Sequence, residues 1–398
     1  METIIYETAD VTAGRFRKHF QEAFVSHEHP IVVRSPGRVN LIGEHTDYNE
    51  GFVLPAAVDK AIYLALSPRS GERFRIHSLD MNERYEDSTG APQRSLDLQW
   101  PNYLAGVVDQ FRKHGYAVGG FDCLFGGDVP IGAGMSSSAA IECGLAYGLN
   151  ELFEIGIPRL ELVRMAQKAE HEFVGVQCGI MDQFINIFGE SRKVLKLDCR
   201  SLDYEQIPFE RPTLTIVLCE TPTRRDLASS GYNERRRQCE EGVRLLRQDH
   251  PSIGSLRDVT EEMLAASRSR LSDLVYRRCA YVVKENRRVL EACRALEAAD
   301  FASFGRLMYE SHDGLSGEYE VSSPGLDALV EGARAFDGVL GARMMGGGFG
   351  GCTINLVDEE ATDAFSEYIR SYYRARMQEG LVVHRAKLTS GTHRIDNH

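Results

Sequence analysis

Residues 36–51 place the tightest constraint on how this chain can fold, because polar and charged side chains crowd together there between two apolar segments. The polar residues are Arg38, Asn40, Glu44, His45, Asp47 and Asn49, and the flanking segments are 31–33 and 52–55. A polar group set among hydrophobic residues costs free energy unless it finds a hydrogen-bonding partner. Carboxylates, an imidazole and a fixed cation together suit the hydroxyl groups of a sugar. We interpret the run as a site for a small polar ligand rather than as a structural polar turn.

Length, charge and cysteine usage narrow the class of protein. A chain of 398 residues is long for one hydrophobic core, so we expect two domains. The formal net charge of −12 argues against nucleic acid or an anionic membrane as the main partner. The nine cysteines are scattered singly, as is typical of reduced thiols in the cytoplasm. We see no apolar run of membrane-spanning length and no signal peptide, and therefore expect a cytoplasmic protein acting on small molecules.

Strand-like and helical patterns alternate along the chain and predict an α+β fold in two parts. Residues 213–218 resemble a strand, whereas residues 276–299 follow a helical period. The most favourable boundary lies near residues 205–212, around two prolines, and divides the chain into units 1–210 and 211–398.

Two glycine-rich segments are candidates for a phosphate-binding loop. Residues 128–140 contain two glycines and three serines ahead of a helical pattern, and a loop that leads into a helix N-terminus favours anions. A plain capped helix would need only one serine and one glycine. Residues 346–351 match Gly-x-Gly-x-x-Gly, but they lead into a strand-like run rather than a helix, so we reject a dinucleotide fingerprint.

Two carboxylates downstream are candidates for chemistry. Asp182 lies among apolar residues, where it is either a helix cap or a functional group held by a cation. Glu170 ends a helical pattern and is, on its own, more typical of an exposed helix residue than of a metal ligand.

Four motifs together resemble the galactokinases of the superfamily of galactose, homoserine, mevalonate and phosphomevalonate (GHMP) kinases. Residues 37–49 resemble the galactokinase signature, and residues 130–140 resemble the phosphate loop of the superfamily. Cys178-Gly-Ile-Met-Asp-Gln-Phe184 and Met345-Gly-Gly-Gly-Phe-Gly-Gly-Cys352 follow in the expected order. The resemblance spans about residues 20 to 390.

The resemblance implies an active site in a cleft between two domains. The N-terminal domain would be ribosomal-protein-S5-domain-2-like and the C-terminal domain ferredoxin-like. The implied reaction is Mg²⁺-dependent transfer of the ATP γ-phosphoryl group to the C1 hydroxyl of α-D-galactose. It opens galactose catabolism through the Leloir pathway. The enzyme would be a monomer or a weak homo-oligomer.

The resemblance also assigns roles to individual residues. Asp182 would be the catalytic carboxylate and Arg38 its cationic partner. The sugar would contact Arg38, Glu44, His45, Asp47, Gly179, Asp182 and Tyr232. ATP would contact Trp100, Gly132, Ala133, Gly134, Met135, Ser136, Ser137, Ser138 and Ala139. Mg²⁺ would be held by Ser138 and Glu170.

Two alternatives remain open at this point. One is a related sugar-1-kinase, for instance for N-acetylgalactosamine, although residues 46–49 resemble the galactose version. The other is a non-catalytic galactose and ATP sensor, which is expected to have lost part of a serine loop that is intact here. Met345, Glu220 and Pro222 depart from the common family pattern, and bear only on fine nucleotide or sugar preference.

Overall fold

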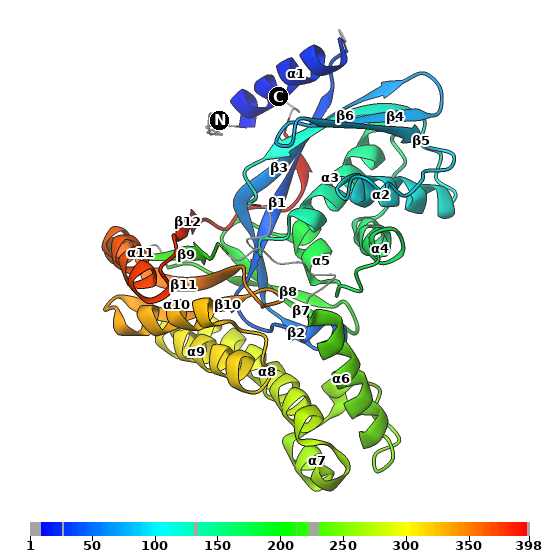
Figure 1. Ribbon diagram of the computed structural model, residues 1–398. Helices are drawn as coiled ribbons and strands as arrows, with labels where there is room; N and C mark the ends of the chain where they lie inside the picture. Colours follow the sequence, from blue (N-terminus) through cyan, green and yellow to red (C-terminus); the bar gives the residue numbers. More distant parts are fainter. Residues whose placement is uncertain (1–8, 26–27, 131–133, 212, 223–230, 396–398) are drawn as a thin grey trace.

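A six-stranded sheet forms the centre of the N-terminal half of the computed structural model, which describes residues 9–25, 28–130, 134–211, 213–222 and 231–395 (Figure 1). The strands lie in the order β13-β1-β3-β6-β4-β5, with antiparallel neighbours except for the parallel pair β4 and β6. They are β1 (Ile31–Asn40), β3 (Pro55–Arg69), β4 (Arg73–Ser78), β5 (Glu83–Ser88), β6 (Gly120–Gly127) and β13 (His393–Arg394).

Helices cover both faces of this sheet, which explains why the central strand β3 is apolar over residues 61–66. Alternate residues of β3 point to opposite faces. Ala61 and Tyr63 pack on α1 (Ala9–Phe24), whereas Ile62 and Leu64 face the core beneath α3 (Ser137–Leu152). Around α3 lie α2 (Pro101–Lys113), α4 (Arg159–Ala169) and α5 (Met181–Phe188).

Two glycines bring α3 close to the sheet. A Cβ atom at Gly144 would lie 2.4 Å from Leu64 Cδ1, and one at Gly148 would lie 2.8 Å from Leu66 Cδ1. The absence of side chains at these positions lets the helix pack directly on β1 and β3. The N-terminal end of α3 thereby meets β1, where the Arg38 backbone N–H donates to Met135 O at 3.0 Å.

A four-stranded antiparallel sheet forms the centre of the C-terminal half. Its order is β10-β11-β9-β12, formed by β9 (Leu214–Glu220), β10 (Val339–Met345), β11 (Cys352–Asp358) and β12 (Val382–Ala386). Numbered along the chain, these strands lie in the order 4-1-3-2, and helices fill the first and last connections. The predicted α+β class and ferredoxin-like C-terminal arrangement are confirmed.

The remaining helices extend the C-terminal half. They are α6 (Tyr232–Leu246), α7 (Glu261–Ala266), α8 (Asp273–Glu297), α9 (Phe301–Gly317), α10 (Pro324–Ala335) and α11 (Thr362–Met377). Helix α8 also contacts a small sheet of β2 (Phe52–Val53), β7 (Lys193–Asp198) and β8 (Tyr204–Pro208), so it lies against both halves of the chain. The boundary near residues 205–212 stays a prediction.

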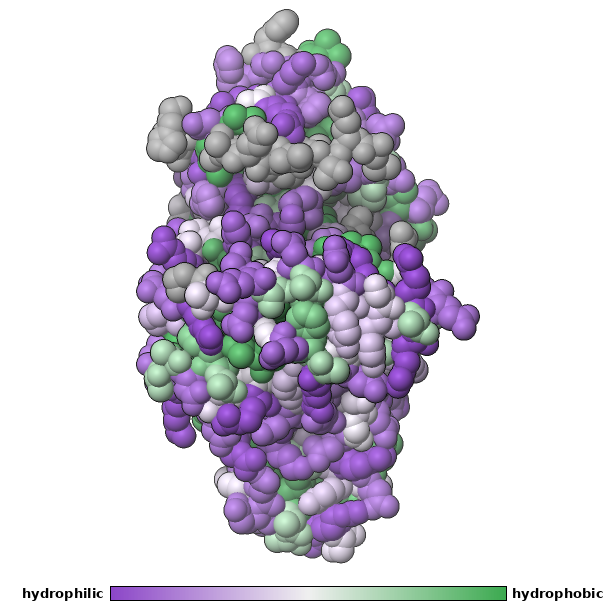
Figure 2. Space-filling view, turned by 90° about the vertical axis from the view of Figure 1, so that its left-hand side faces the viewer, coloured by the Kyte–Doolittle hydropathy of each residue, from purple (hydrophilic) through white to green (hydrophobic). Residues whose placement is uncertain are grey.

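The end of the chain returns to the first sheet. Strand β13 pairs with β1, and the Thr392 hydroxyl donates to Asn186 Oδ1 at 2.5 Å. The face in Figure 2 is mostly hydrophilic, with hydrophobic side chains in small groups. Across the described residues, no helix is both long and apolar enough to cross a membrane.

Candidate active site

A cavity of about 620 Å³ brings together residues from both halves of the chain. Most of the predicted site lies on its wall: Arg38, Glu44, His45, Asp47, Gly134, Ser136, Ser137, Ser138, Glu170, Gly179, Asp182 and Tyr232. The C-terminal half also contributes Gly346 and Gly347 of the second glycine-rich segment. That segment connects the antiparallel strands β10 and β11, in agreement with the rejection of a dinucleotide fingerprint.

Arg38 and Asp182 form a two-pronged ion pair at one end of the cavity. Arg38 Nε donates to Asp182 Oδ1 at 2.7 Å, and Arg38 Nη2 donates to Oδ2 at 2.5 Å. The pairing register of β1 with β3 shifts between Pro36 and Arg38. The shift lies next to the point at which the Arg38 side chain extends into the cavity. Arg38 Nη1 also donates to Gly134 O, so the guanidinium links the catalytic candidate to the phosphate-loop candidate.

Ser136 is a second partner of Asp182. Its hydroxyl donates to Asp182 Oδ2 at 2.6 Å, and its backbone is left-handed, with φ of 56°. A non-glycine residue in this region is uncommon and is held there by its surroundings. Asp182 lies in the first turn of α5, but among the described hydrogen bonds its carboxylate accepts none from the backbone N–H groups of that helix. It accepts hydrogen bonds from Arg38 and Ser136 instead. This favours the functional interpretation over the helix cap.

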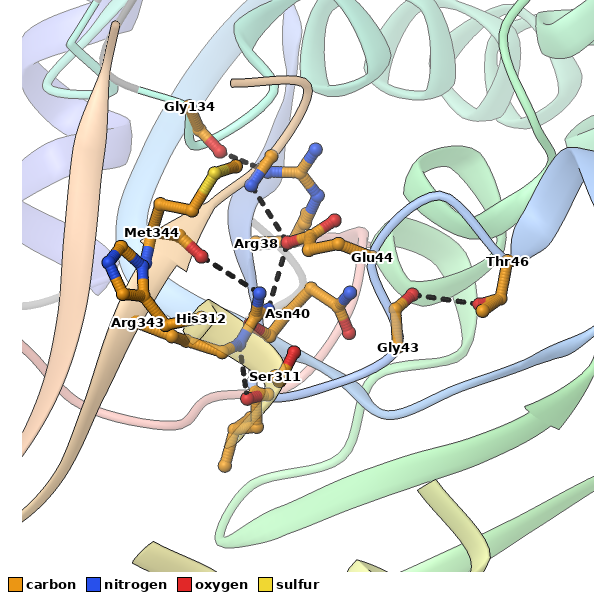
Figure 3. A network of polar contacts seen from close by, with 12 residues as sticks. Arg38, Asn40, Gly43, Glu44, Thr46, Gly134, Ser311, His312, Arg343 and Met344 are labelled. Carbon is orange, nitrogen blue, oxygen red and sulfur yellow. Dashed lines mark hydrogen bonds and ion pairs between the residues drawn. The ribbon is translucent and has the colours of Figure 1, made fainter. Parts of the chain in front are cut away.

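Glu44 is buried and held by the C-terminal half (Figure 3). Its Oε1 accepts from Arg343 Nη2 at 2.9 Å and from the Gly346 backbone N–H at 2.8 Å. Burial would raise the pKa of the Glu44 carboxyl, but the guanidinium groups of Arg343 and Arg38 outweigh it and lower the pKa. The carboxylate is therefore an acceptor, as a sugar hydroxyl requires.

Sequence reasoning missed Arg343. The signal was present, because a charged residue interrupts the apolar strand β10 three positions before the glycine run. Its side chain is fully buried, with 0% exposed.

His45 lies at the start of a buried chain of aromatic hydroxyls. Its Nδ1 is 2.7 Å from the Tyr48 hydroxyl, which is 2.9 Å from the Tyr319 hydroxyl. The Tyr232 ring lies 5.2 Å from the Tyr48 ring and 5.5 Å from the His45 ring. Burial raises the pKa of Tyr48, Tyr232 and Tyr319 well above the ordinary value, so these hydroxyls stay protonated. Three residues thus fix the orientation of the imidazole.

Asp47 and Gly179 are in direct contact. A Cβ atom at Gly179 would lie 1.7 Å from Asp47 Oδ2, so any side chain at position 179 would displace the Asp47 carboxylate. Burial, with a further contribution from the negative charge of Asp182, raises the pKa of the Asp47 carboxyl to about 7. The pocket therefore holds this carboxyl in balance between two protonation states near neutral pH.

Glu170 and Ser138 suit a magnesium ion. Glu170 ends up in a π-helical turn after α4, where Gln183 Nε2 donates to its Oε2 at 2.9 Å and Cys178 Sγ donates at 3.4 Å. Burial and then the charge of Asp182 raise the pKa of the Glu170 carboxyl, and a divalent cation bound beside it would favour the ionised form. The described residues contain no cluster of three or more candidate ligands, and Mg²⁺ usually takes one or two carboxylates together with substrate phosphates. The residues present therefore fit Mg²⁺.

The remaining nucleotide candidates fall into three groups. Gly134 and Ser136–Ser138 line the cavity, whereas Met135 and Ala139 are buried behind it. Gly132 and Ala133 lie outside the described residues. Trp100 is not among the described residues that line the cavity: it is 8% exposed, packs on Phe125 and donates its indole N–H to Glu83 Oε2 at 2.6 Å. Its neighbours Gln99 and Tyr103 line the wall instead.

Comparisons with known proteins agree with this geometry. Family models match at residues 18–68 (galactokinase galactose-binding signature), 102–190 (GHMP kinases N terminal domain) and 261–375 (GHMP kinases C terminal). The chain is 43% identical to a galactokinase of Roseiflexus sp., over 96% of this chain and 97% of that protein. It is 41% identical to a galactokinase of Thermotoga maritima, over 92% of this chain and all of that protein.

Solved structures show the same similarity. Lactococcus lactis galactokinase complexed with galactose superposes with a TM-score of 0.92 at 34% identity, covering 96% of this chain and 99% of that chain. Methanococcus jannaschii mevalonate kinase superposes with a TM-score of 0.64 at 16% identity, covering 92% of this chain and 100% of that chain, a likeness of fold alone.

Proposed function

Because the chain belongs to the galactokinase family, we propose that it transfers the γ-phosphoryl group of ATP to the C1 hydroxyl of α-D-galactose. The observation that carries the proposal is the Arg38–Asp182 pair on the wall of a cavity shared with Glu44, His45 and Asp47. The products are galactose 1-phosphate and ADP.

The sugar pocket positions the acceptor hydroxyl. Glu44, His45 and Asp47 offer hydrogen bonds to the other hydroxyls of the sugar, and the Tyr232 ring closes the same wall. Gly179 leaves space for the Asp47 carboxylate. Such positioning is a large part of catalysis, because reacting atoms held in line need no further ordering in the transition state.

Asp182 is the group that receives or orients the C1 hydroxyl proton. As the bond from O1 to the γ-phosphorus forms, the bond from that phosphorus to the β–γ bridging oxygen breaks, and the electron pair leaves with ADP. Arg38 holds both carboxylate oxygens, and Ser136 fixes one of them, so the carboxylate cannot rotate away from the hydroxyl.

The phosphate groups of ATP belong at the N-terminal end of α3. Backbone N–H groups in the first turn of a helix lack partners within the helix and attract anions. Ser136–Ser138 line the cavity at this point. Ser138 and Glu170 would hold Mg²⁺, which supplies charge neutralisation for the phosphates.

We also propose a cytoplasmic monomer or weak homo-oligomer that acts on small molecules. The cysteines support the location: all nine lie in the described residues and are thiols rather than disulfides.

A sugar panel tests the proposed function. ADP release is measured with ATP, Mg²⁺ and, in turn, galactose, glucose, N-acetylgalactosamine and 2-deoxygalactose, and binding of each sugar is measured by calorimetry. We expect the highest kcat/KM with galactose. A clear preference for another sugar, or binding of galactose and ATP without ADP release, contradicts the proposal and identifies a related sugar kinase or a sensor, respectively.

A further inference from the structure

We propose that Arg343 is a positioning residue for the sugar: it sets the shape of residues 40–46 and aims the Glu44 carboxylate into the cavity. This inference rests on the proposed function, because it takes Glu44 to be a sugar contact. Arg343 belongs to β10 in the C-terminal half, whereas residues 40–46 begin at the last residue of β1 in the N-terminal half.

The guanidinium of Arg343 is occupied on all sides (Figure 3). Nε donates to Leu41 O at 2.7 Å, Nη1 donates to Met344 O at 2.8 Å, and Nη2 donates both to Asn40 O at 2.5 Å and to Glu44 Oε1 at 2.9 Å. Three of these four acceptors belong to residues 40–46. Arg343 is not among the described residues that line the cavity, so it acts on the sugar through Glu44.

Other residues of the C-terminal half hold the same loop at separate points. The Gly43 backbone N–H donates to Glu285 Oε1 at 2.9 Å, and the Tyr281 hydroxyl donates to Glu44 O at 3.1 Å. These contacts reach the backbone of the loop alone. Arg343 is the described side chain that bonds to both the loop backbone and the Glu44 carboxylate, so it links the path of the loop to the direction of the functional group.

The pair is buried, which makes its loss costly. The side chains of Arg343 and Glu44 are 0% and 4% exposed. Removing one member of a buried ion pair leaves the other without compensation, and here it would also remove the Arg343 donor from three carbonyl groups. Lysine offers a point charge in place of a planar fork, so it can keep the pairing with Glu44 but cannot reach three separated acceptors.

The test is the steady-state kinetics of Arg343→Met and Arg343→Lys. We expect the galactose KM to rise about 100-fold in the methionine variant and about 10-fold in the lysine variant, the range for truncating a buried charge pair. The ATP KM should stay within about threefold of wild type, because three of the four Arg343 hydrogen bonds go to residues 40–44 and none goes to residues 134–138.

The control is Arg75→Met, at a guanidinium–carboxylate pair that is more exposed. Arg75 forms a two-pronged pair with Asp122 at 2.7 and 2.6 Å on the strands β4 and β6, far along the sheet from the sugar loop. This variant also loses a guanidinium–carboxylate pair, but its galactose KM should equal that of wild type.

Amide hydrogen exchange of the wild-type enzyme provides a second readout that needs no variant. Without galactose, peptides covering residues 40–46 and the Gly346 amide should exchange at least about 100-fold more slowly than unprotected amides, because the loop is formed in advance. An unchanged galactose KM in a folded Arg343 variant, an equal rise in the ATP KM, or protection that arises only when galactose is added overturns the inference. If the wild-type protein does not phosphorylate galactose, the proposed function is contradicted instead. The two failures can be distinguished because the exchange measurement does not depend on turnover.

Discussion

Arg38 and Asp182 are 144 positions apart in the sequence, yet the Arg38 guanidinium donates one hydrogen bond to each oxygen of the Asp182 carboxylate. Pairing through both oxygens fixes the plane of a carboxylate as well as its position. Ser136 also donates to Oδ2, at 2.6 Å. The carboxylate that is proposed to meet the C1 hydroxyl is therefore oriented before any substrate binds.

Asp182→Asn should abolish turnover and spare sugar binding. Asparagine keeps the shape of the side chain but cannot receive a proton, and general acid–base groups contribute about 10²- to 10⁴-fold to rate. We expect kcat to fall about 1000-fold, whereas the galactose dissociation constant measured by calorimetry should stay within about threefold of wild type. Near-normal turnover by a folded variant would contradict the role assigned to Asp182.

Gly179→Ala should weaken sugar binding through Asp47. The new Cβ atom would lie 1.7 Å from Asp47 Oδ2, so the carboxylate must move. We expect the galactose KM to rise at least about 10-fold, with a smaller change in the ATP KM. Gly317→Ala is the control, because a Cβ atom at position 317, at the end of α9, would meet nothing within 4 Å. Equal galactose KM values in both variants would argue against the Asp47 contact.

Galactose affinity should depend on pH through Asp47. Its pKa of about 7 lies above the ordinary value of 3.8, so the folded enzyme protonates Asp47 where the unfolded chain does not. The contribution of this group to stability is thus full below about pH 4 and is lost as the pH rises through about 7.

Galactose affinity should change with pH in the opposite direction to stability, because a sugar hydroxyl donates to the ionised carboxylate. We expect the galactose dissociation constant to be about tenfold higher at pH 6 than at pH 8. In Asp47→Asn the affinity should be lower overall and this pH dependence should be lost. Calorimetry at pH 6, 7 and 8 without nucleotide measures both, and an unchanged pH profile in the variant would assign the titration to another group.

Glu170→Gln should raise the magnesium requirement. The amide keeps the size of the side chain but removes the charge that would attract the cation, and we expect the Mg²⁺ concentration for half-maximal activity to rise at least about 10-fold. Galactose binding without nucleotide should not change. Glu172→Gln is the matched control, because this side chain is 46% exposed and pairs with Lys113 at the surface. The same magnesium profile in both variants would exclude Glu170 as a ligand.

The local sequence was sufficient to predict that the polar side chains of residues 36–51 share one site. It was not sufficient to predict which distant residues hold them. Glu44, His45 and Asp47 lie within four residues of one another, so their shared environment could be inferred from their crowding alone. Arg343 comes 299 residues after Glu44, and no spacing rule connects them. Such contacts follow from the way in which β10 lies against the end of β1, which depends on the packing of both halves.

The sequence alone also could not decide the role of a residue whose side chain suits two different roles. An aromatic residue such as Trp100 packs in a core as readily as it binds a base, and here its ring packs on Phe125. Ser136 lines the cavity and its contact with ATP stays a prediction, whereas the hydrogen bond from its hydroxyl to Asp182 was not predicted. That orientation depends on the path of the loop in space.

The sequence by itself determined the chemical inventory of residues 36–51: carboxylates, an imidazole and a cation that had to be buried with partners because apolar segments flank them. Only the tertiary structure decided which partners they have. Asp182 of α5 pairs with Arg38, and Arg343 of the C-terminal half pairs with Glu44. The physical reason is that burial demands compensation for each charge, while the identity of the compensating group depends on which distant segments the fold brings within hydrogen-bonding distance.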